Sequence, residues 1–142
     1  FRNGANCAQA VVGAYAEDCG LEFDQAMRLA SSFGAGMGRL REVCGAVSGM
    51  LMVVGLKEGY CDLTCKASKD RHYARVQALA AEFKGKTGSL ICRELLGLPE
   101  GNDVPVSEER TDDYYTKRPC EALVGLAAQI VDEHLKSVSV RD

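Results

Sequence analysis

The chain has 142 residues, a formal net charge of -3 and seven cysteines. This length suits one domain with its own core, and we expect a single domain over residues 1–142. The slight acidity argues against a nucleic-acid partner, because nucleic acids select basic domains. The longest apolar run, residues 43–56, is shorter than the roughly 20 residues that a membrane span needs.

The cysteine count points to a reducing compartment. Seven is an odd number, and no export signal is visible at the start of this sequence. Disulfide frameworks of small secreted proteins normally use an even number of cysteines. We therefore predict a cytoplasmic protein, in which clustered cysteines more often serve redox or metal chemistry than structural cross-linking.

The first half of the chain predicts helices, because apolar residues recur at helical spacing and strand-like alternation does not persist. Asn6 suits the N-cap of a first helix, which we expect to end near Gly20. Asp24 suits the N-cap of a second helix. A third helix is predicted from about Arg41 to Gly59.

A fourth helix is predicted over residues 63–84, where apolar side chains form one stripe. Gly85 and Gly88 are expected to end it, since glycine is a poor helix former. Ser89 suits the N-cap of a short fifth helix that ends at Gly97.

The last part of the chain reads as a loop followed by a helix. Residues 98–111 hold two prolines and several acids, which predicts a loop. Pro119 suits the first turn of a last helix that reaches about Val138. His72 and His134 lie in charged segments, so we expect both to be solvated. The sequence thus predicts an all-α fold, a single compact bundle of about six helices with a Gly-rich connection before its central helix.

The stretch FGAGMGRLREVCGAVSG holds five glycines and one cysteine. Gly34, Gly36 and Gly38 match neither the dinucleotide fingerprint nor the phosphate-binding loop, so we predict no bound nucleotide. We expect them to form a tight connection in which φ is positive. Gly45 and Gly49 are four residues apart, share one helix face and let a neighbouring helix approach closely.

Cys44 lies in the first turn of the predicted third helix. Unpaired backbone N–H groups and the helix dipole favour an anion there. Arg39 and Arg41 add positive potential nearby. Both features lower the pKa of a thiol, so the sequence predicts that Cys44 is a reactive thiolate.

Several motifs in this order resemble one known family. The chain carries NCAQA near its start, then FGAGMGR, then CGAVSG, then two further cysteines. Together they resemble the C_GCAxxG_C_C family of small redox-active proteins, and the resemblance spans nearly the whole chain. Its four characteristic cysteines correspond to Cys7, Cys44, Cys92 and Cys120, for which the resemblance implies a redox role without naming a substrate.

All four of these cysteines lie near predicted helix starts. Four helix N-termini that point at one place would form a positive pocket for thiolates. We expect this pocket to be surrounded by four further residues, Gly36, Gly38, Arg39 and Gly45. The spacing leaves two chemistries open: the four cysteines are candidate ligands of an iron–sulfur cluster or zinc, or they are reversible thiol–disulfide pairs.

Other interpretations also stay open at this stage. The cysteines could hold a structural zinc in a non-catalytic binding protein, or the chain could be a metal-free module that forms a homodimer through its glycine face. Cys61 and Cys65 are four residues apart and could form a second pair, whereas Cys19 matches no pattern. No haem is predicted, because C-x-x-C-H is absent. We expect an unidentified redox partner and no membrane span.

Overall fold

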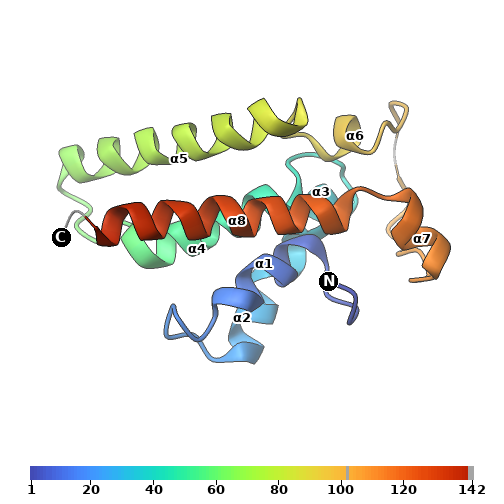
Figure 1. Cartoon of the computed structure of the whole chain (residues 1–142), viewed down its shortest axis with the longest axis horizontal. Coiled ribbons are helices and arrows are strands. Elements are labelled where there is room, and N and C mark those ends of the chain that lie inside the picture. The colour runs from blue at the N-terminus through green and yellow to red at the C-terminus, as the bar shows by residue number, and fades with distance from the viewer. Residues whose placement is uncertain (102, 141–142) are drawn as a thin grey trace.

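The computed structural model describes residues 1–101 and 103–140, and these residues are all-helical, which confirms the predicted fold class. Three long helices, α4 (Gly45–Glu58), α5 (Lys66–Thr87) and α8 (Cys120–Ser139), lie side by side (Figure 1). The shorter elements are α1 (Cys7–Tyr15), α2 (Phe23–Ala30), the 3₁₀ turn η1 (Ser31–Phe33), α3 (Gly34–Met37), α6 (Cys92–Leu95) and α7 (Asp112–Lys117).

The core lies between α1, α4, α5 and α8. Met50 of α4, Phe83 of α5 and Ile130 of α8 are among the largest fully buried side chains. Helix α4 contributes the most to this core because it is apolar around most of its circumference, as expected of a helix covered on several sides. It therefore forms the centre of the fold, as the sequence predicts.

The close approach of α1 to α4 depends on two glycines. A Cβ atom at Gly49 would lie 2.9 Å from the carbonyl oxygen of Ala8 and 3.0 Å from Cβ of Val11. A Cβ atom at Gly45 would lie 3.0 Å from Cβ of Cys7. The predicted glycine face is thus real, but α1 of the same chain covers it. It cannot serve as the dimer contact that the sequence suggested.

Residues 35–39, which include three of the four residues of α3, form a left-handed turn, so α3 is not a regular right-handed helix. The φ angles are 54° at Ala35, 69° at Gly36, 72° at Met37, 61° at Gly38 and 71° at Arg39. The predicted tight connection is therefore present, with more left-handed residues than the glycines alone require. A right-handed helix cannot include such residues. For this reason α4 begins at Gly45 and not near Arg41, where φ is again positive at 60°.

Two other predicted helix boundaries differ near the N-terminus. Helix α1 ends at Tyr15, and the chain then turns so that Gly20 adopts a φ of 69° outside the helix. Asp24 is not an N-cap but lies in the first turn of α2, where its charge suits the helix dipole. Glu22 occupies the N-cap position without a side-chain hydrogen bond.

Boundaries also differ around α5 and α6. Gly85 lies inside α5, and Gly88 ends this helix in a left-handed conformation, with φ at 93°. Ser89 precedes the N-cap position of α6, which Ile91 occupies. The Ser89 hydroxyl instead accepts a hydrogen bond from the Ile91 N–H at 3.0 Å.

The predicted loop over residues 98–111 is confirmed where the structure describes it, but a short helix follows it. Thr111 caps α7 by accepting a hydrogen bond from the N–H of Tyr114 at 3.2 Å. His134 was expected in solvent, yet its Nε2 atom lies 2.8 Å from a carboxylate oxygen of Glu58. This contact holds the ring against α4.

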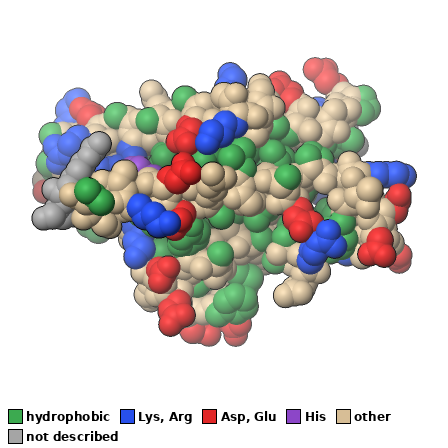
Figure 2. Space-filling model, in the orientation of Figure 1, with side chains coloured by type: hydrophobic (Ala, Val, Ile, Leu, Met, Phe, Trp, Pro, Cys, Tyr) green, Lys and Arg blue, Asp and Glu red, His purple; other side chains and the backbone are tan. Residues whose placement is uncertain are grey.

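The surface carries charges of both signs. Figure 2 shows Lys and Arg side chains interspersed with Asp and Glu over the visible face, with apolar side chains between them. Within the described residues, every helix is too short or too polar to cross a bilayer.

Substituting Gly49 by Ala should destabilise the protein by about 1–3 kcal/mol, because the added Cβ would clash with the backbone of α1. The matched control is Gly55→Ala in the same helix, where the Cβ would meet nothing within 4 Å. Since alanine favours helix by about 1 kcal/mol over glycine, this control should leave stability unchanged or raise it. Urea unfolding measures both, and equal effects of the two variants would contradict the proposed close packing.

Candidate functional site

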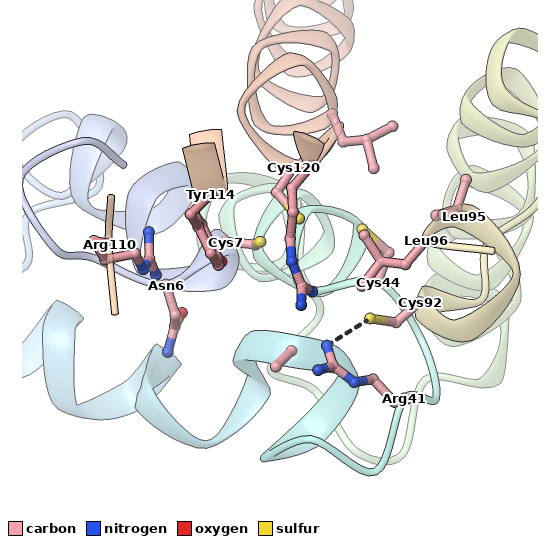
Figure 3. A pocket seen from close by; sticks show the side chains of 14 residues that line it. Asn6, Cys7, Arg41, Cys44, Cys92, Leu95, Leu96, Arg110, Tyr114 and Cys120 are labelled. Atoms are coloured by element: carbon pink, nitrogen blue, oxygen red, sulfur yellow. Dashed lines mark hydrogen bonds between the residues drawn. The ribbon is translucent and has the colours of Figure 1, made fainter. Parts of the chain in front are cut away.

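Four cysteines from four helix starts line one cavity. Cys7 opens α1, Cys44 is the N-cap of α4, Cys92 opens α6 and Cys120 opens α8. The cavity has a volume of about 60 Å³, and Figure 3 shows the four side chains converging on it. The structure therefore brings together all four cysteines that the sequence singled out.

A capping box fixes the position of Cys7. The Asn6 carboxamide oxygen accepts a hydrogen bond from the Gln9 N–H at 2.9 Å, and the Gln9 side chain accepts one from the Asn6 N–H at 3.0 Å. The Asn6 amide also donates to the carbonyl of Ser31 at 3.0 Å. Gly34 leaves the room that Asn6 needs, because a Cβ there would overlap its side chain. These contacts orient the start of α1 toward the cavity.

Cys44 and Cys92 are placed by a short antiparallel pairing. Val43 and Ile91 form a single β-bridge. The N–H of Cys44 donates to the carbonyl of Leu90 at 2.8 Å, and the N–H of Cys92 donates to that of Glu42 at 2.6 Å. The two cysteines thus flank one backbone ladder, although 48 positions separate them in sequence (92 minus 44).

The left-handed turn at residues 35–39 also helps to position Cys92. A Cβ atom at Gly36 would lie 2.7 Å from both Cα of Arg41 and Cβ of Cys92. Gly36 also accepts a hydrogen bond from the N–H of Glu42 at 3.0 Å. Glycine is therefore required at this position twice, for its positive φ and for the close approach of Cys92.

Arg41 connects Cys92 to an acidic residue. Its guanidinium is buried, and Nη1 lies 3.7 Å from Sγ of Cys92 (Figure 3). Its Nε donates to a carboxylate oxygen of Asp103 at 2.5 Å. The hydrogen bond from Arg41 holds the pKa of Asp103 below its ordinary value. Burial still raises the pKa of the Cys92 thiol, although Arg41 opposes that rise.

Cys7 and Cys120 form an unequal pair. A hydrogen bond from Cys7 lowers the pKa of Cys120 to about 7 against the effect of burial, with help from Arg118, Arg110 and Arg41. The same hydrogen bond, followed by burial, raises the pKa of Cys7. The pKa of Cys120 therefore lies below that of Cys7, so Cys120 is the first of the two thiols to ionise as pH rises.

The predicted low pKa of Cys44 is wrong. Burial raises its pKa to about 11, and this outweighs the hydrogen bonds from the N–H groups of Ala46 and Val47 at the helix start. The neighbouring arginines do not compensate, because Arg41 contacts Cys92 and Arg39 pairs with Asp103 and Val104. A helix N-terminus alone does not stabilise a thiolate this deeply buried.

Three cavity residues escaped the sequence analysis: Arg110, Tyr114 and Arg118. The Arg110 guanidinium lies 4.9 Å from the centre of the Tyr114 ring, and that of Arg118 lies 5.2 Å from it. Arg118 also pairs with Glu108. The sequence contains only a weak signal for these residues. Tyr114 and Arg118 are four residues apart, the spacing at which side chains meet on one helix face, and they lie just before the predicted last helix.

The four residues expected around the pocket differ in whether they line the cavity. Gly45 lines the cavity, whereas Gly36, Gly38 and Arg39 do not. Gly36 instead packs closely against Cβ of Cys92. Arg39 donates from Nε to the carbonyl of Val104 at 2.9 Å and so holds the loop that follows α6.

The other three cysteines lie outside this cavity. Cys19 is half-buried against the core, and Cys61 is exposed. Cys65 is the N-cap of α5, at the end of that helix remote from α6 (Figure 1). Its Sγ lies 3.1 Å from the Ser68 hydroxyl, and this contact lowers the pKa of Cys65.

The positions of the side chains also indicate whether they could together bind one metal ion. In residues 1–101 and 103–140, no group of three or more His, Cys, Asp or Glu side chains has the geometry to hold a metal ion. This arrangement of side chains gives no support to a zinc ion bound by three or four of these cysteines, and zinc stays a prediction.

No curated protein and no solved structure matches the chain. One family model does match it, over residues 5–134, and is described as "Putative redox-active protein (C_GCAxxG_C_C)". The matched range includes all four cavity cysteines and nearly the whole chain. The protein belongs to the C_GCAxxG_C_C redox-active family.

Proposed function

We propose that the protein is a thiol redox protein in which Cys7 and Cys120 interconvert between a dithiol and a disulfide. The observation that carries this proposal is that Cys7 and Cys120 line the same cavity together with three arginines. In this setting the pKa of Cys120 is lowered to about 7. Thiolates are the attacking species in thiol–disulfide exchange, and a thiol whose pKa is near ambient pH attacks best.

The exchange consists of two displacements. The Cys120 thiolate attacks a substrate disulfide, forms a mixed disulfide and releases one thiolate, which takes up a proton. Cys7 then loses its proton and attacks Sγ of Cys120, which releases the second substrate thiol. Two electrons pass from the two cysteines to the substrate, so one disulfide is consumed, one is formed, and two thiols leave.

The environment of Cys7 suits this order of steps. The interaction with Cys120 is the largest cause of its raised pKa, and burial is the second. The interaction with the Cys120 thiolate is lost once Cys120 is bound in a mixed disulfide, whereas burial and the more distant thiols continue to oppose ionisation. Cys7 is thus kept protonated until the first displacement has occurred, and it becomes a nucleophile afterwards.

Burial limits the substrate. Cys120 is 8% exposed, and the cavity beside it is about 60 Å³. A thiol this buried is hard for a folded partner protein to reach, so we propose a low-molecular-weight disulfide as the oxidant. We also propose that the protein acts in the cytoplasm, because reducing conditions there would regenerate a dithiol of this kind.

A second candidate is an iron–sulfur cluster. The observation that favours it is that four cysteines line one cavity, since such clusters are held by four cysteine thiolates. A two-iron cluster binds its cysteines in pairs and needs no group of three around one metal ion. The ligands would be Cys7, Cys44, Cys92 and Cys120, and the cluster would supply one-electron transfer.

Thiolate absorbance in the ultraviolet tests the ionisation of Cys120. The reduced protein should show a titration step with a midpoint near pH 7, because the pKa of Cys120 is lowered to about 7. Cys120→Ser should remove this step. Cys44→Ser is the matched control and should keep it, because burial holds the pKa of Cys44 at about 11. A step that survives in Cys120→Ser would assign the thiolate to another residue.

Stability should depend on pH through the same group. The pKa of Cys120 falls from an ordinary value of 9.0 to about 7 in the folded protein. Its contribution is therefore fully present above pH 9 and is lost as pH falls through 7. The raised pKa values of Cys7 and Cys44 act only above pH 9, so they do not obscure this range. Urea unfolding of the reduced protein should show stability that rises between pH 7 and 9, and less so in Cys120→Ser.

Oxidation with a neutral small disulfide, such as oxidised 2-mercaptoethanol, tests the pairing. Peptide mapping of the product should find a Cys7–Cys120 disulfide. Cys7→Ser should instead accumulate a mixed disulfide at Cys120, because the second displacement is blocked, whereas Cys44→Ser should behave as the wild type does. A different pair, or an unchanged product in Cys7→Ser, would refute the assignment.

Anaerobic purification tests the second candidate. An iron–sulfur cluster would give visible absorption bands and bound iron, and serine at any of the four cavity cysteines should weaken both. Cys19→Ser is the control, because Cys19 lies outside the cavity. Colourless, iron-free protein that still forms the Cys7–Cys120 disulfide would favour thiol chemistry.

A further inference from the structure

A second, larger space adjoins the cysteine cavity, and we call it the outer hollow. Its lining residues all belong to the segment that connects α6 to α8, between Leu96 and Pro119. Its volume is about 410 Å³, against about 60 Å³ for the cysteine cavity. Binding sites for small molecules commonly have roughly 300–1,000 Å³. The outer hollow therefore has room for a ligand that the cysteine cavity is too small to hold.

Three side chains belong to both spaces. Leu96, Tyr114 and Arg118 line the cysteine cavity and also line the outer hollow. The hollow further reaches Pro119, which directly precedes Cys120 in the chain. Cys120 itself is 8% exposed. A ligand in the outer hollow is therefore separated by one wall of side chains from the thiol that the proposed function makes the nucleophile.

The lining of the outer hollow carries three acidic and two basic side chains. The acids are Glu108, Glu109 and Asp113, and the bases are Lys117 and Arg118. Arg118 pairs with Glu108, and Lys117 pairs with Asp113 at 2.9 Å. Glu109 is exposed and has no ion-pair partner within residues 1–101 and 103–140. The hollow thus offers one carboxylate that can accept hydrogen bonds from a cationic ligand.

The remaining lining suits the hydrocarbon part of such a ligand. Leu96, Leu98 and Pro119 contribute apolar surface, and Tyr114 contributes an aromatic ring. A short methylene chain that ends in an ammonium group matches both parts of the lining. Its methylene groups would leave water against the apolar side chains, and its ammonium group would donate to Glu109.

We propose that the outer hollow binds a low-molecular-weight disulfide that carries primary ammonium groups, and that this is the class of oxidant that Cys120 reduces. The choice of oxidant rests on the proposed dithiol–disulfide function. The binding of the ammonium ligand does not rest on it, and no change in the ionisation of a cysteine is involved in that binding.

The reaction with such a ligand is balanced. The sulfur of Cys120 forms a bond to one sulfur of the ligand, the S–S bond of the ligand breaks, and the released thiolate takes up a proton and leaves as an aminothiol. Cys7 then gives up its proton, attacks the sulfur of Cys120 and displaces the second aminothiol. The two cysteines lose two electrons, and the ligand gains them.

Hexamethylenediamine tests the binding without any chemistry, because two methylene groups replace the sulfur atoms of the disulfide cystamine. NMR titration of the isotope-labelled reduced protein at constant ionic strength should show saturable shifts over residues 108–117. Glu109→Gln should weaken the binding about threefold, the effect of one exposed charge contact. The uncharged analogue 1,6-hexanediol should bind more weakly than the diamine.

Glu100→Gln is the matched control for this titration. It removes the same charge from the same loop but lies outside the outer hollow, so the affinity for the diamine should stay that of the wild type. Equal affinity in Glu109→Gln and the wild type, or tighter binding of the diol than of the diamine, would overturn the site.

Rates of mixed-disulfide formation at Cys120, followed by peptide mapping, test the oxidant. The background is Cys7→Ser, in which the second displacement is blocked. Each rate is divided by the rate of the same reagent with free dithiothreitol, which removes the intrinsic reactivity of the disulfide. Cystamine should then react faster than neutral oxidised 2-mercaptoethanol, and dithiodipropionate, which carries carboxylates, should react slowest.

Glu109→Gln gives the decisive comparison in the same background. It should lower the normalised rate of cystamine about threefold and leave that of oxidised 2-mercaptoethanol unchanged. A purely structural effect of the substitution would change both rates alike. Such parallel changes, or a faster reaction of dithiodipropionate than of cystamine, would overturn the proposed class of oxidant.

Tyr114→Leu tests the route from the outer hollow to Cys120. The smaller side chain should speed the reaction of all three disulfides, whereas Tyr114→Phe keeps the ring and should react as the parent does. If Tyr114→Leu does not fold, Leu96→Ala removes a side chain from the same wall. Unchanged or slower reactions in the folded variant would refute this route.

The failure of this proposal and the failure of the proposed function are distinguishable. Diamine binding that depends on Glu109, in a protein that forms no Cys7–Cys120 disulfide, would refute the redox function and support the ligand site. A Cys7–Cys120 disulfide that forms at the same normalised rate from all three reagents would refute the class of oxidant and leave the redox function intact.

Discussion

The close packing of α1 on α4 is the constraint on which the site depends. At Gly45 and Gly49 the two backbones approach to distances that no side chain would allow. This contact lies directly behind the start of α1, so it places Cys7 beside the start of α4, where Cys44 is the N-cap. Helix α8 packs on both helices and brings Cys120 to the same end. The glycines therefore determine where the thiols meet, although none of them takes part in the chemistry.

Gathering four thiols in one cavity makes their ionisation unequal. Helix N-termini favour thiolates, but burial opposes them, and at Cys44 burial prevails. Cys120 differs because its interaction with Cys7 and with three arginines together outweighs the effect of its burial on the pKa. One thiolate beside one thiol is what an ordered exchange reaction requires, and four equivalent thiolates would repel one another. The arginines are thus as important to the site as the cysteines.

Periodicity and small residues predicted the all-helical fold and the glycine face, because these are local signals. The resemblance to a family, carried by motifs from Cys7 to Cys120, identified the four cysteines that line the cavity. Prediction from the sequence failed where the outcome depended on tertiary contacts. The left-handed turn delayed the start of α4, and burial reversed the expected pKa shift of Cys44. Arg110 and Arg118 escaped notice because no motif marks them, and only folding carries their segment to the cavity. His134 likewise turned out to face Glu58, a residue 76 positions away.

The left-handed turn before α4 shows what the fold tolerates in order to build this site. Each non-glycine residue in that conformation costs about 1–2 kcal/mol, and Ala35, Met37, Arg39 and Arg41 all adopt it. The same conformation buries Arg41 with its guanidinium between Cys92 and Asp103, and it directs Arg39 toward the loop that contains Asp103. A relaxed right-handed helix through these residues would continue α4 toward its N-terminus and would remove the β-bridge between Val43 and Ile91. Strain of this kind persists only where surrounding contacts enforce it. Here those contacts include the pairing of the Arg41–Cys44 segment with residues 90–93, the same ladder that sets Cys92 beside Cys44.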